Sequence, residues 1–430
     1  MIEDKIAIEE RFVFTSKAQK NVISIIVAGL VLFAIGVAML IFGGGSHEAA
    51  AHGAHAAAGG HHEAYHWSQR LILNFWHNSV FFTGIAVMGI FFVSYNYVAY
   101  AGWSAGLLRV PLAFGSFLPY AAVLVIGLFF IGKHDLFHWS HEGISTVGSP
   151  NYDPIIAGKS GFLNVPFFVF RLFLYFGLWY LMYHIIRKNA LDEDIHGTTA
   201  YWHKNTISCA VFLIIFGVTS STSAWDLVMS VDTHWFSTMF GWYVFASWHV
   251  SALAAITLTV VLLKERGYLS IVNENHLHDL GKFMFAFSIF WTYIWFSQFI
   301  LIFYANLPEE TVYFIDRLRG FGNHYTGIFF FNIFINFAFP FLTLMTRESK
   351  RSTMFLKIVS IGILIGHWLD FYLMLTPGIL KGNSELGILE IGTALIFLGS
   401  FIYIVANKLS KSLLIAKNHP MLEESMNHHI

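Results

Sequence analysis

Long apolar runs separated by short polar segments dominate this chain of 430 residues. Ten of these runs reach about 20 residues, the length that a helix rising 1.5 Å per residue needs to cross a hydrocarbon core of about 30 Å. The pattern predicts an all-α integral membrane protein with about ten transmembrane helices. The expected helices are 22–42, 76–98, 110–133, 162–186, 205–228, 238–263, 282–305, 325–346, 354–376 and 387–408.

The segments between these helices suggest how the helices are grouped. A linker rich in His, Ala and Gly separates the first helix from the others, so we expect two four-helix bundles plus two peripheral helices. Histidine-rich tracts can bind metal, but Gly and Ala fix no coordination geometry, and a flexible linker is the favoured interpretation. The expected segments are a cytoplasmic N-terminal segment (1–21), transmembrane helix 1 (22–42), the outer linker (43–75), the first bundle (76–228), the second bundle (229–376), transmembrane helix 10 (387–408) and a cytoplasmic tail (409–430).

The composition agrees with a membrane protein and excludes several other classes. Hydrophobic residues make up 56% of the chain and charged residues 12%, which is too apolar for a soluble globular domain. The formal net charge of −1 provides no concentrated basic surface for nucleic acid. The single cysteine, Cys209, cannot form an intrachain disulfide, a zinc-finger cage or a cysteine-ligated iron–sulfur cluster. We therefore expect no bound metal here, and any redox centre other than haem must come from another subunit.

The distribution of basic residues predicts the orientation in the membrane. The N-terminal segment, the loops at 99–109, 187–204, 264–282 and 347–357, and the C-terminal tail with Lys408 just before it together carry eighteen Lys and Arg, whereas the alternate loops, with Lys133 at the end of the third helix, carry six. Because cytoplasmic loops are enriched in Lys and Arg, both termini are expected in the cytoplasm.

Ionisable residues lie inside or against the apolar runs, among them Arg171, Asp226, His249, His367 and Asp370. An ionised side chain at the bilayer centre costs roughly 2.5–3.5 kcal/mol, so such residues usually face the protein interior and carry protons, ions or polar headgroups. His249 and His367 could in principle bracket a haem. No helix, however, carries two histidines at a haem-bracketing spacing, so a hydrogen-bonded core or proton-path histidine is favoured for each.

A polar cluster follows the third apolar run, where Lys133, His134 and Asp135 are consecutive and His138 and His141 come next. The three histidines recur at i, i+4 and i+7, which predicts one shared helical face. An imidazole that titrates near ambient pH, oriented by a carboxylate, can accept protons from a quinol. Alternatively, Lys133 extends to the interface and Asp135 caps the helix.

A second polar block joins the fifth and sixth helices and contains Asp226, Asp232 and His234. The block holds no Lys or Arg, so its carboxylates need a counter-charge from elsewhere, and Lys133 and Arg171 are the candidates. Unpaired carboxylates near a low-dielectric region can relay protons. The alternative is an interfacial loop anchored by its aromatic residues.

A third block begins at the cytoplasmic start of the seventh helix, with Asp279. Gln298 and Asn306 follow inside the helix and Glu309 stands at its far end, so these residues could line a proton half-channel. Alternatively, Asp279 is the helix N-cap, a position that Asp favours and that suits the helix dipole.

An ordered run of motifs resembles the polysulfide-reductase (NrfD-like) membrane-subunit family. More narrowly, the run resembles two related subunits of alternative complex III, a bacterial quinol:electron-acceptor oxidoreductase, and by length the chain is similar to the smaller of the two. The motifs cover roughly residues 225–350, and the ten-helix layout covers the whole chain. The motifs are Trp225-Asp226, Met229-Ser230, Asp232, His234-Trp235, Ser237-Thr238, Phe240-Gly241, His278-Asp279, Gly281-Lys282, Trp295, Gln298, Tyr304, Asn306 and Pro308-Glu309-Glu310.

The resemblance implies a membrane subunit of a respiratory quinol:cytochrome c oxidoreductase in the bacterial cytoplasmic (inner) membrane. It implies a quinol substrate, with menaquinone expected as the quinone, and no haem or metal in this chain. The implied partners are a second NrfD-like subunit, an iron–sulfur protein, c-type cytochromes that carry haem c, lipids and a terminal oxidase. The expected quinone-binding residues are His77, Lys133, His134, Asp135, His138 and Arg171, and the expected proton-path residues are Asp226, Asp232, His234, His249, Asp279, Glu309, His367 and Asp370.

Two other classes of function stay open at this point. A proton- or ion-coupled transporter would also bury charges and would show inverted repeats with broken helices near mid-membrane. A non-catalytic structural subunit would need its buried acids only for stability.

Overall fold

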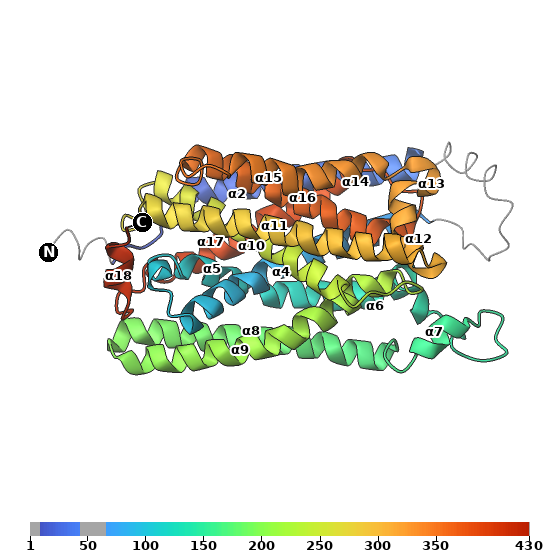
Figure 1. The fold of residues 1–430 in the computed structure, drawn as a ribbon, viewed down its shortest axis with the longest axis horizontal. Coiled ribbons are helices and arrows are strands. Elements are labelled where there is room, and N and C mark those ends of the chain that lie inside the picture. The colour runs from blue at the N-terminus through green and yellow to red at the C-terminus, as the bar shows by residue number, and fades with distance from the viewer. Residues whose placement is uncertain (1–8, 44–65, 430) are drawn as a thin grey trace.

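The computed structural model describes residues 9–43 and 66–429, and over these ranges the chain is helical, with no strand. Ten helical segments are long and apolar enough to cross a membrane, which confirms the all-α membrane fold. Figure 1 shows them running side by side along the long axis of the molecule. The segments are α2 (Ser16–Gly43), α4 (Trp67–Val98), α5 (Arg109–Phe114) continued by α6 (Leu118–Leu136), α8 (Val165–His196), α9 (Thr199–Leu227), α10 (Phe240–Glu265), α11 (Glu274–Ala305), α14 (Thr326–Ile333) with a π-helix (Phe334–Ala338) and α15 (Phe339–Thr343), α16 (Thr353–Leu380), and α17 (Ile388–Leu409).

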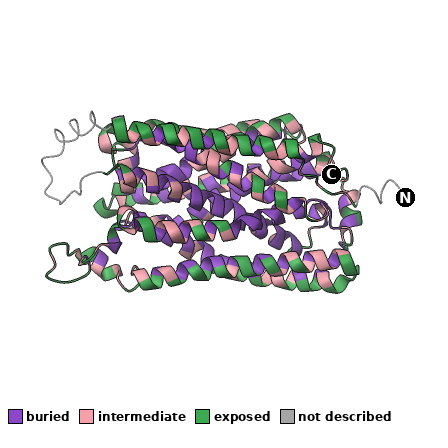
Figure 2. Cartoon of the chain, turned by 180° about the vertical axis from the view of Figure 1, so that it is seen from behind, coloured by how far each residue is buried: buried purple, intermediate pink, exposed green. Residues whose placement is uncertain are grey.

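The spanning helices pack in two groups, which meet where α4 of one group contacts α10 and α16 of the other. In one group α4 contacts α6 and α9, and α8 contacts both α6 and α9. In the other, α10 contacts α11 and α16, while α14 and α15 pack against α16. Helix α4 also contacts α10 and α16, so the groups meet there. Figure 2 shows the result as buried central helices inside more exposed ones.

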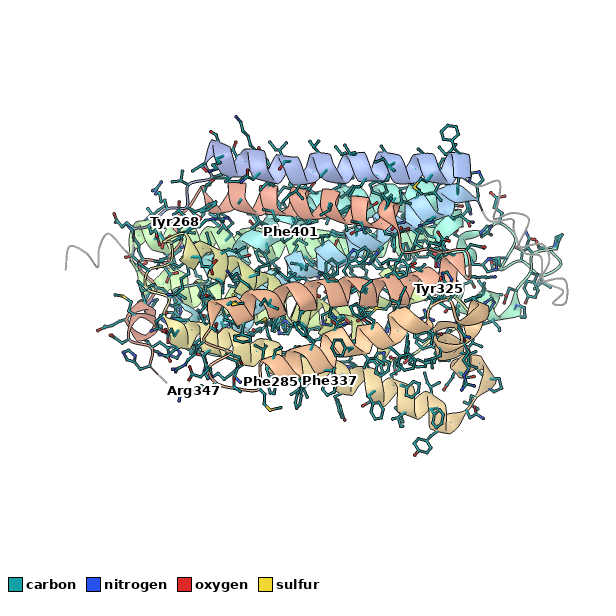
Figure 3. All side chains as sticks on the ribbon, turned by 90° about the horizontal axis from the view of Figure 1, so that it is seen from above. Tyr268, Phe285, Tyr325, Phe337, Arg347 and Phe401 are labelled. Atoms are coloured by element: carbon teal, nitrogen blue, oxygen red, sulfur yellow. The ribbon has the colours of Figure 1, made fainter. Side chains whose placement is uncertain are left out.

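Helix α2 lies at one edge of the molecule, packed along α17 (Figures 1 and 3). Glycines bring the two backbones together. A Cβ on Gly36 would stand 2.7 Å from Leu389 Cα, and one on Gly392 would stand 2.5 Å from Phe33 N. Small residues are typical of helix contacts inside membranes because they permit this approach. Most of the remaining surface of α2 is exposed, as expected for a peripheral helix.

The two ends of the molecule differ in their short elements. The end where α4 finishes and α11 begins, here called the basic end, carries the C-terminal α18 (Leu422–Met426). The tail joins the N-terminal segment there, since Leu414 N donates to Glu10 O and Arg11 forms an isolated antiparallel bridge with Leu413. The opposite end carries α7 (Pro154–Lys159), α12 (Pro308–Leu318) and α13 (Gly320–Asn323).

Several helices are longer than their apolar runs, and the expected boundaries there were wrong. Helix α4 begins at Trp67 rather than at residue 76, α8 continues to His196 rather than 186, and α11 begins at Glu274 rather than 282. In α4 the extension has a clear cause, because a polar residue near its start finds a partner on another helix. In α4, Arg70 Nε donates to Glu390 Oε1 at 2.7 Å. The rest of the expected linker, residues 44–65 with most of its histidines, lies outside the described residues.

Candidate functional site

The most elaborate buried polar cluster surrounds the carboxylate of Asp370 in α16. Four side chains donate hydrogen bonds to it from three other helices. Ser247 Oγ and Trp291 Nε1 reach Oδ2 at 2.7 and 3.0 Å, Asn332 Nδ2 reaches Oδ1 at 2.8 Å, and the Tyr243 hydroxyl also donates to Oδ1. Asp370 is fully buried. An ionised carboxylate can accept all four bonds, so the cluster satisfies a buried negative charge without a water-exposed face.

Local sequence explains how these donors meet. Tyr243 and Ser247 are four residues apart in α10 and so point to the same side of the helix. Asn332 is itself held by Asn336, whose Nδ2 donates to Asn332 Oδ1 at 2.7 Å. Asn336 lies in the π-helix, a form that is frequent at functional sites. On the facing helix, a Cβ at Gly366 would stand 2.2 Å from Asn336 Oδ1, so glycine is required for this contact.

His367 lies beside the carboxylate, with Nδ1 3.7 Å from Asp370 Oδ2. It is fully buried, and neither ring nitrogen has a hydrogen-bond partner among the described residues. Its ring meets Trp291 edge to face. Buried polar atoms without partners are rare and call for an explanation such as a bound water or a catalytic role.

The cluster contains no permanent positive charge. Within the described part of the chain, no Lys or Arg forms an ion pair with Asp370, and His367 is its only charged or titratable basic neighbour at salt-bridge distance. A carboxylate without a fixed counter-ion can take up a proton without leaving an unpaired cation in the membrane. Asp370 is therefore chemically suited to bind and release a proton.

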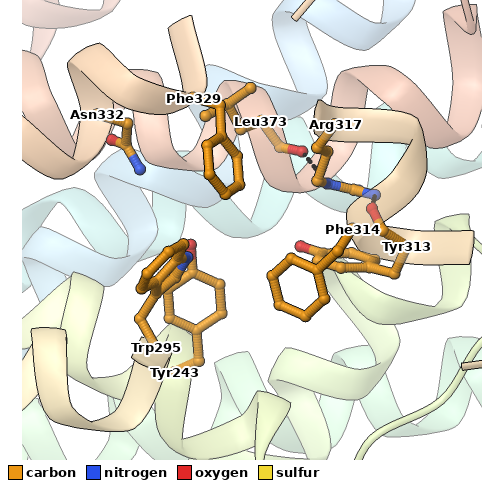
Figure 4. A pocket seen from close by; sticks show the side chains of 8 residues that line it. All are labelled: Tyr243, Trp295, Tyr313, Phe314, Arg317, Phe329, Asn332 and Leu373. Carbon is orange, nitrogen blue, oxygen red and sulfur yellow. Dashed lines mark hydrogen bonds between the residues drawn. The ribbon is translucent and has the colours of Figure 1, made fainter. Parts of the chain in front are cut away.

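A small pocket opens on the side of the cluster nearest the opposite end, between Tyr243, Asn332 and Arg317 (Figure 4). Its free volume of about 10 Å³ is room for about one water molecule. The rest of the lining is Trp295, Tyr313, Phe314, Phe329 and Leu373.

Arg317 forms the polar wall of this pocket and links α12 to α16. Its Nε donates to Leu373 O at 2.8 Å and one terminal nitrogen to Met374 O at 3.0 Å. Pro377 lies inside α16 and has no N–H to offer the Leu373 carbonyl four residues earlier, so the guanidinium replaces that bond. The same guanidinium stacks 3.4 Å from the Tyr313 ring centroid. Burial raises the pKa of the Tyr313 hydroxyl to about 12, although Arg317 opposes this shift.

The first group of helices holds a second buried carboxylate, Asp226 in α9, in a different setting. Arg171 of α8 donates two hydrogen bonds to this carboxylate, from Nε to Oδ2 at 2.7 Å and from a terminal nitrogen to Oδ1 at 2.8 Å. Tyr175, one helical turn after Arg171, donates to Oδ2 at 2.7 Å. Phe162 and Phe167 cover the guanidinium, with ring centroids 3.8 and 4.3 Å from Cζ. Of the two counter-charges proposed for Asp226, Arg171 is the one that contacts it.

The expected shared helical face of the three histidines was wrong. Helix α6 ends at Leu136, with Gly132 already out of helical geometry, and a separate 3₁₀ turn begins at His138. The turn still folds the rings together, since His141 lies 5.2 Å from His134 and 5.5 Å from His138 between centroids. The group is at the surface of the opposite end, where Lys133 and Asp135 are partly buried.

His234 joins this surface group and forms a bridge across two loops. Its Nε2 lies 2.6 Å from Asp153 Oδ2, and its ring lies 6.2 Å from His138. Burial alone raises the pKa of Asp153, but the hydrogen bonds from His234 and from Ile156 N outweigh it, so that this pKa is lowered. Asp232, two residues before His234, is partly buried.

The six expected quinone-binding residues do not gather in one place. His77 is buried between α4 and α16, where Nε2 lies 2.9 Å from Trp368 O. Arg171 is engaged by Asp226, and the other four lie at the opposite end, around the turn after α6.

The remaining proton-path candidates also fall in separate environments. His249 is buried among aromatic rings, with 4.3 Å between its ring centroid and that of Phe287. Neither of its nitrogens has a hydrogen-bond partner among the described residues. Glu309 is exposed in the first turn of α12. Asp279 is buried at the basic end, bonded to Lys282 at 2.5 Å and to His428 at 2.7 Å.

The alternative interpretation of Asp279 as a helix N-cap was wrong. The N-cap of α11 is Asn273, whose side chain accepts from Asn275 N and His276 N. In return, His276 Nδ1 accepts a hydrogen bond from the Asn273 backbone N–H. Asp279 stands in the second turn, where the backbone N–H groups already bond within the helix.

Five members of the central cluster were not recognised from sequence: Tyr243, Ser247, Trp291, Asn332 and Arg317. Each could be assigned to an interfacial or apolar position, and only the spacing of Tyr243 and Ser247 offered a signal. No group of three or more His, Cys, Asp or Glu side chains in the described part of the chain could hold a metal ion.

Comparisons with known proteins do not identify the chain: neither a protein-family model nor a curated protein matches it. The resemblance to the polysulfide-reductase membrane-subunit family therefore stays a prediction.

Proposed function

We propose that this chain is a membrane subunit of a respiratory quinol oxidoreductase and that its second helix group conducts protons through Asp370. The observation that carries the proton path is a fully buried carboxylate held by four neutral donors and by no Lys or Arg of the described residues. Such residues inside membranes are costly and usually functional.

The chemistry of the proposed path rests on two titratable groups in contact. His367 Nδ1 lies 3.7 Å from Asp370 Oδ2, which is beyond hydrogen-bond distance, so a small rotation of the ring or a bridging water would complete the path between them. Neither nitrogen of His367 has another partner among the described residues. Tyr243 connects the carboxylate to the water-sized pocket and Arg317. A hydroxyl can receive a proton on one side and release one on the other, which suits a relay.

Toward the basic end, the proposed path continues along α11 and α16. Ser288 and Ser360 are buried on these helices between the central cluster and Asp279. Asp279 would be the cytoplasmic end of the path, in keeping with the predicted orientation. Asp226 is held by Arg171 and in this proposal stabilises the first helix group.

The quinol and the partners enter the proposal through the sequence resemblance. The chain has one cysteine, which is buried, and electrons would pass to iron–sulfur clusters and haem c on partner subunits. A quinol, menaquinol in the proposal, would lose its protons at the Lys133–His138 turn, where the histidines gather.

The decisive experiment compares Asp370→Asn with wild type in the purified, intact assembly. We expect quinol oxidation to continue while protons translocated per electron fall, since an amide cannot carry the proton. Asp226→Asn is the matched control, because it neutralises the other buried carboxylate, and it should lower stability without changing the proton stoichiometry. An unchanged stoichiometry in Asp370→Asn would refute the path.

The quinol site needs its own test. His134→Ala combined with Asp135→Asn should reduce quinol oxidation by the assembled complex if the turn after α6 binds quinol. Full turnover with normal assembly would assign that site to another subunit.

An ion-coupled transporter is the second candidate, favoured by one observation. The π-helix interrupts regular α-helical geometry beside the buried carboxylate, and α16 carries Pro377 two turns after Asp370. Interrupted helices at a polar site are typical of transporters. Purification in mild detergent separates the two proposals. Iron–sulfur and haem proteins that remain bound support the oxidoreductase, and a chain that purifies alone and takes up ions in vesicles supports the transporter.

A further inference from the structure

A second recess, at the basic end, brings three cations together between α5, α8 and α17. It is lined by Arg109, Arg187 and Lys408, with Ser412 and two apolar residues beside them. The cations come from segments far apart in the sequence, and each lies near the point where its helix reaches the end of the bundle. Like charges that converge in this way repel each other unless an anion lies among them.

The charges of this recess are only partly compensated. Arg109 is buried, forms an ion pair with Asp194 at 2.5 Å and donates to Ala190 O at 2.6 Å. The buried carboxylate of Glu193 also lies close enough to Arg109 to interact with its charge. Neither Arg187 nor Lys408 forms a hydrogen bond or an ion pair with any described residue, and the two interact unfavourably with each other. Two positive charges in the recess therefore lack an anionic partner.

Arg109 provides an independent sign that a ligand belongs here. Its side chain is 4% exposed, and its Nε has no hydrogen-bond partner in the described part of the chain. A buried guanidinium N–H without a partner is costly. An anion bound in the recess that Arg109 lines would supply the missing acceptor and at the same time neutralise the other two cations.

The residues around the recess indicate that the anion is the headgroup of a lipid. The recess lies between membrane-spanning helices at their ends, and large apolar side chains are exposed on the same helices toward the membrane interior. Examples are Tyr180 and Leu181 on α8, 43% and 52% exposed, and Tyr403 on α17, 37% exposed. The free volume of the recess is about 10 Å³, so a phosphate would bind at its mouth and leave its acyl chains against an apolar surface. Basic pockets between spanning helices are typical binding sites for anionic headgroups.

We propose that Arg109, Arg187 and Lys408 form a binding site for the phosphate headgroup of an anionic phospholipid. The site does not depend on the proposed proton path or on quinol chemistry, since it lies at the basic end, in the other helix group and α17. It would fasten α17, and with it α2, to α8 through a lipid that bridges them.

The test uses the full-length chain in detergent and follows thermal unfolding while dioleoyl-phosphatidylglycerol or dioleoyl-phosphatidylcholine is added. We expect phosphatidylglycerol to raise the unfolding temperature of wild type, and phosphatidylcholine to do so much less. In the Arg187→Gln/Lys408→Gln double variant, the half-saturating lipid concentration should rise about 25-fold, because each cation contributes about fivefold. Lys188→Gln is the matched control, an exposed cation next to Arg187 that lines no part of the recess, and it should respond as wild type does.

Each of the other outcomes overturns the proposal. Equal stabilisation of wild type by both lipids would show that the headgroup charge is not recognised, and this comparison needs no variant to fold. A double variant with the wild-type response would place the anion elsewhere. Inorganic phosphate, added alone at the same concentrations, should have no effect, and an equal shift would mean that the site binds free phosphate and not a lipid.

Discussion

The two helix groups each bury one carboxylate, and they compensate its charge in opposite ways. In the first, Arg171 neutralises Asp226 with two parallel bonds. In the second, neutral donors surround Asp370, and the nearest basic group is the titratable His367. A fixed ion pair holds its charge and strongly stabilises one protonation state, whereas neutral donors stabilise the ionised carboxylate less and leave no unpaired cation behind when it takes up a proton. The difference separates a structural acid from one suited to proton transfer.

Breaking the fixed pair should give the largest effect. Arg171→Met leaves Asp226 as an uncompensated buried charge and should lower the free energy of unfolding by about 3–5 kcal/mol. Thermal unfolding in detergent measures it. Arg171→Met/Asp226→Leu removes both charges and should recover most of the loss. If the single variant unfolds at the wild-type temperature, the pair is not a stabilising element.

Removing one donor from the second group should have a smaller effect on stability. Trp291→Phe keeps an aromatic ring but deletes the indole N–H that bonds to Asp370 and to Ser247, and hydrogen bonds to charged groups contribute about 1.5–3 kcal/mol. We expect a lower unfolding temperature together with slower proton translocation. Trp295→Phe, which changes a neighbouring indole that does not bond to the carboxylate, is the control. Equal effects of the two would assign the change to packing.

Arg317 tests whether the pocket beside Asp370 depends on α12. Arg317→Met keeps an unbranched side chain of similar reach but leaves the Leu373 and Met374 carbonyls without their donor, a loss of about 1–2 kcal/mol for these neutral acceptors. Amide hydrogen exchange near Pro377 should become faster, while exchange in α8 should not change. Exchange that stays slow near Pro377 would contradict this role.

The surface bridge between Asp153 and His234 should have the smallest effect. Because the pKa of Asp153 is lowered in the folded protein, its stabilising contribution is present above the ordinary carboxyl pKa and is lost as the pH falls through the folded value. His234 is half exposed, so the contribution should stay below about 1 kcal/mol. Asp153→Asn should therefore remove a small acid-dependent part of the unfolding temperature, and a wild-type acid response in this variant would exclude the bridge.

The number of spanning helices could be predicted from the sequence, because an apolar run of about 20 residues has the length that a membrane crossing requires. The sequence was less informative about helix ends, where residues such as Arg70 extend a helix only because Glu390 of another helix receives them. The turn at His138 escaped prediction for a similar reason, since periodicity continued past the point where Gly132 leaves helical geometry.

The candidate site was visible only through its ionisable members. Asp370 and His367 are noticeable as charges inside an apolar run, and so is Asp226. Tyr243 and Trp291 resemble ordinary core aromatics, and nothing in the sequence shows that they face Asp370 across two helix contacts. Arg317 was counted among the loop cations, although it is buried, 2% exposed. Which helix faces meet depends on packing between residues more than a hundred positions apart.

The bond between Arg317 and the carbonyl opposite Pro377 also has a mechanical meaning. A proline normally provides a helix with a hinge, because the turn before it lacks one rung of its hydrogen-bond ladder. In α16 the Arg317 side chain of α12 supplies the missing hydrogen bond to the Leu373 carbonyl, so a residue outside the helix restrains bending at Pro377. Bending of α16 near Asp370 would require α12 to move with it, which turns a short surface helix into a lever on the most buried acid of the second helix group.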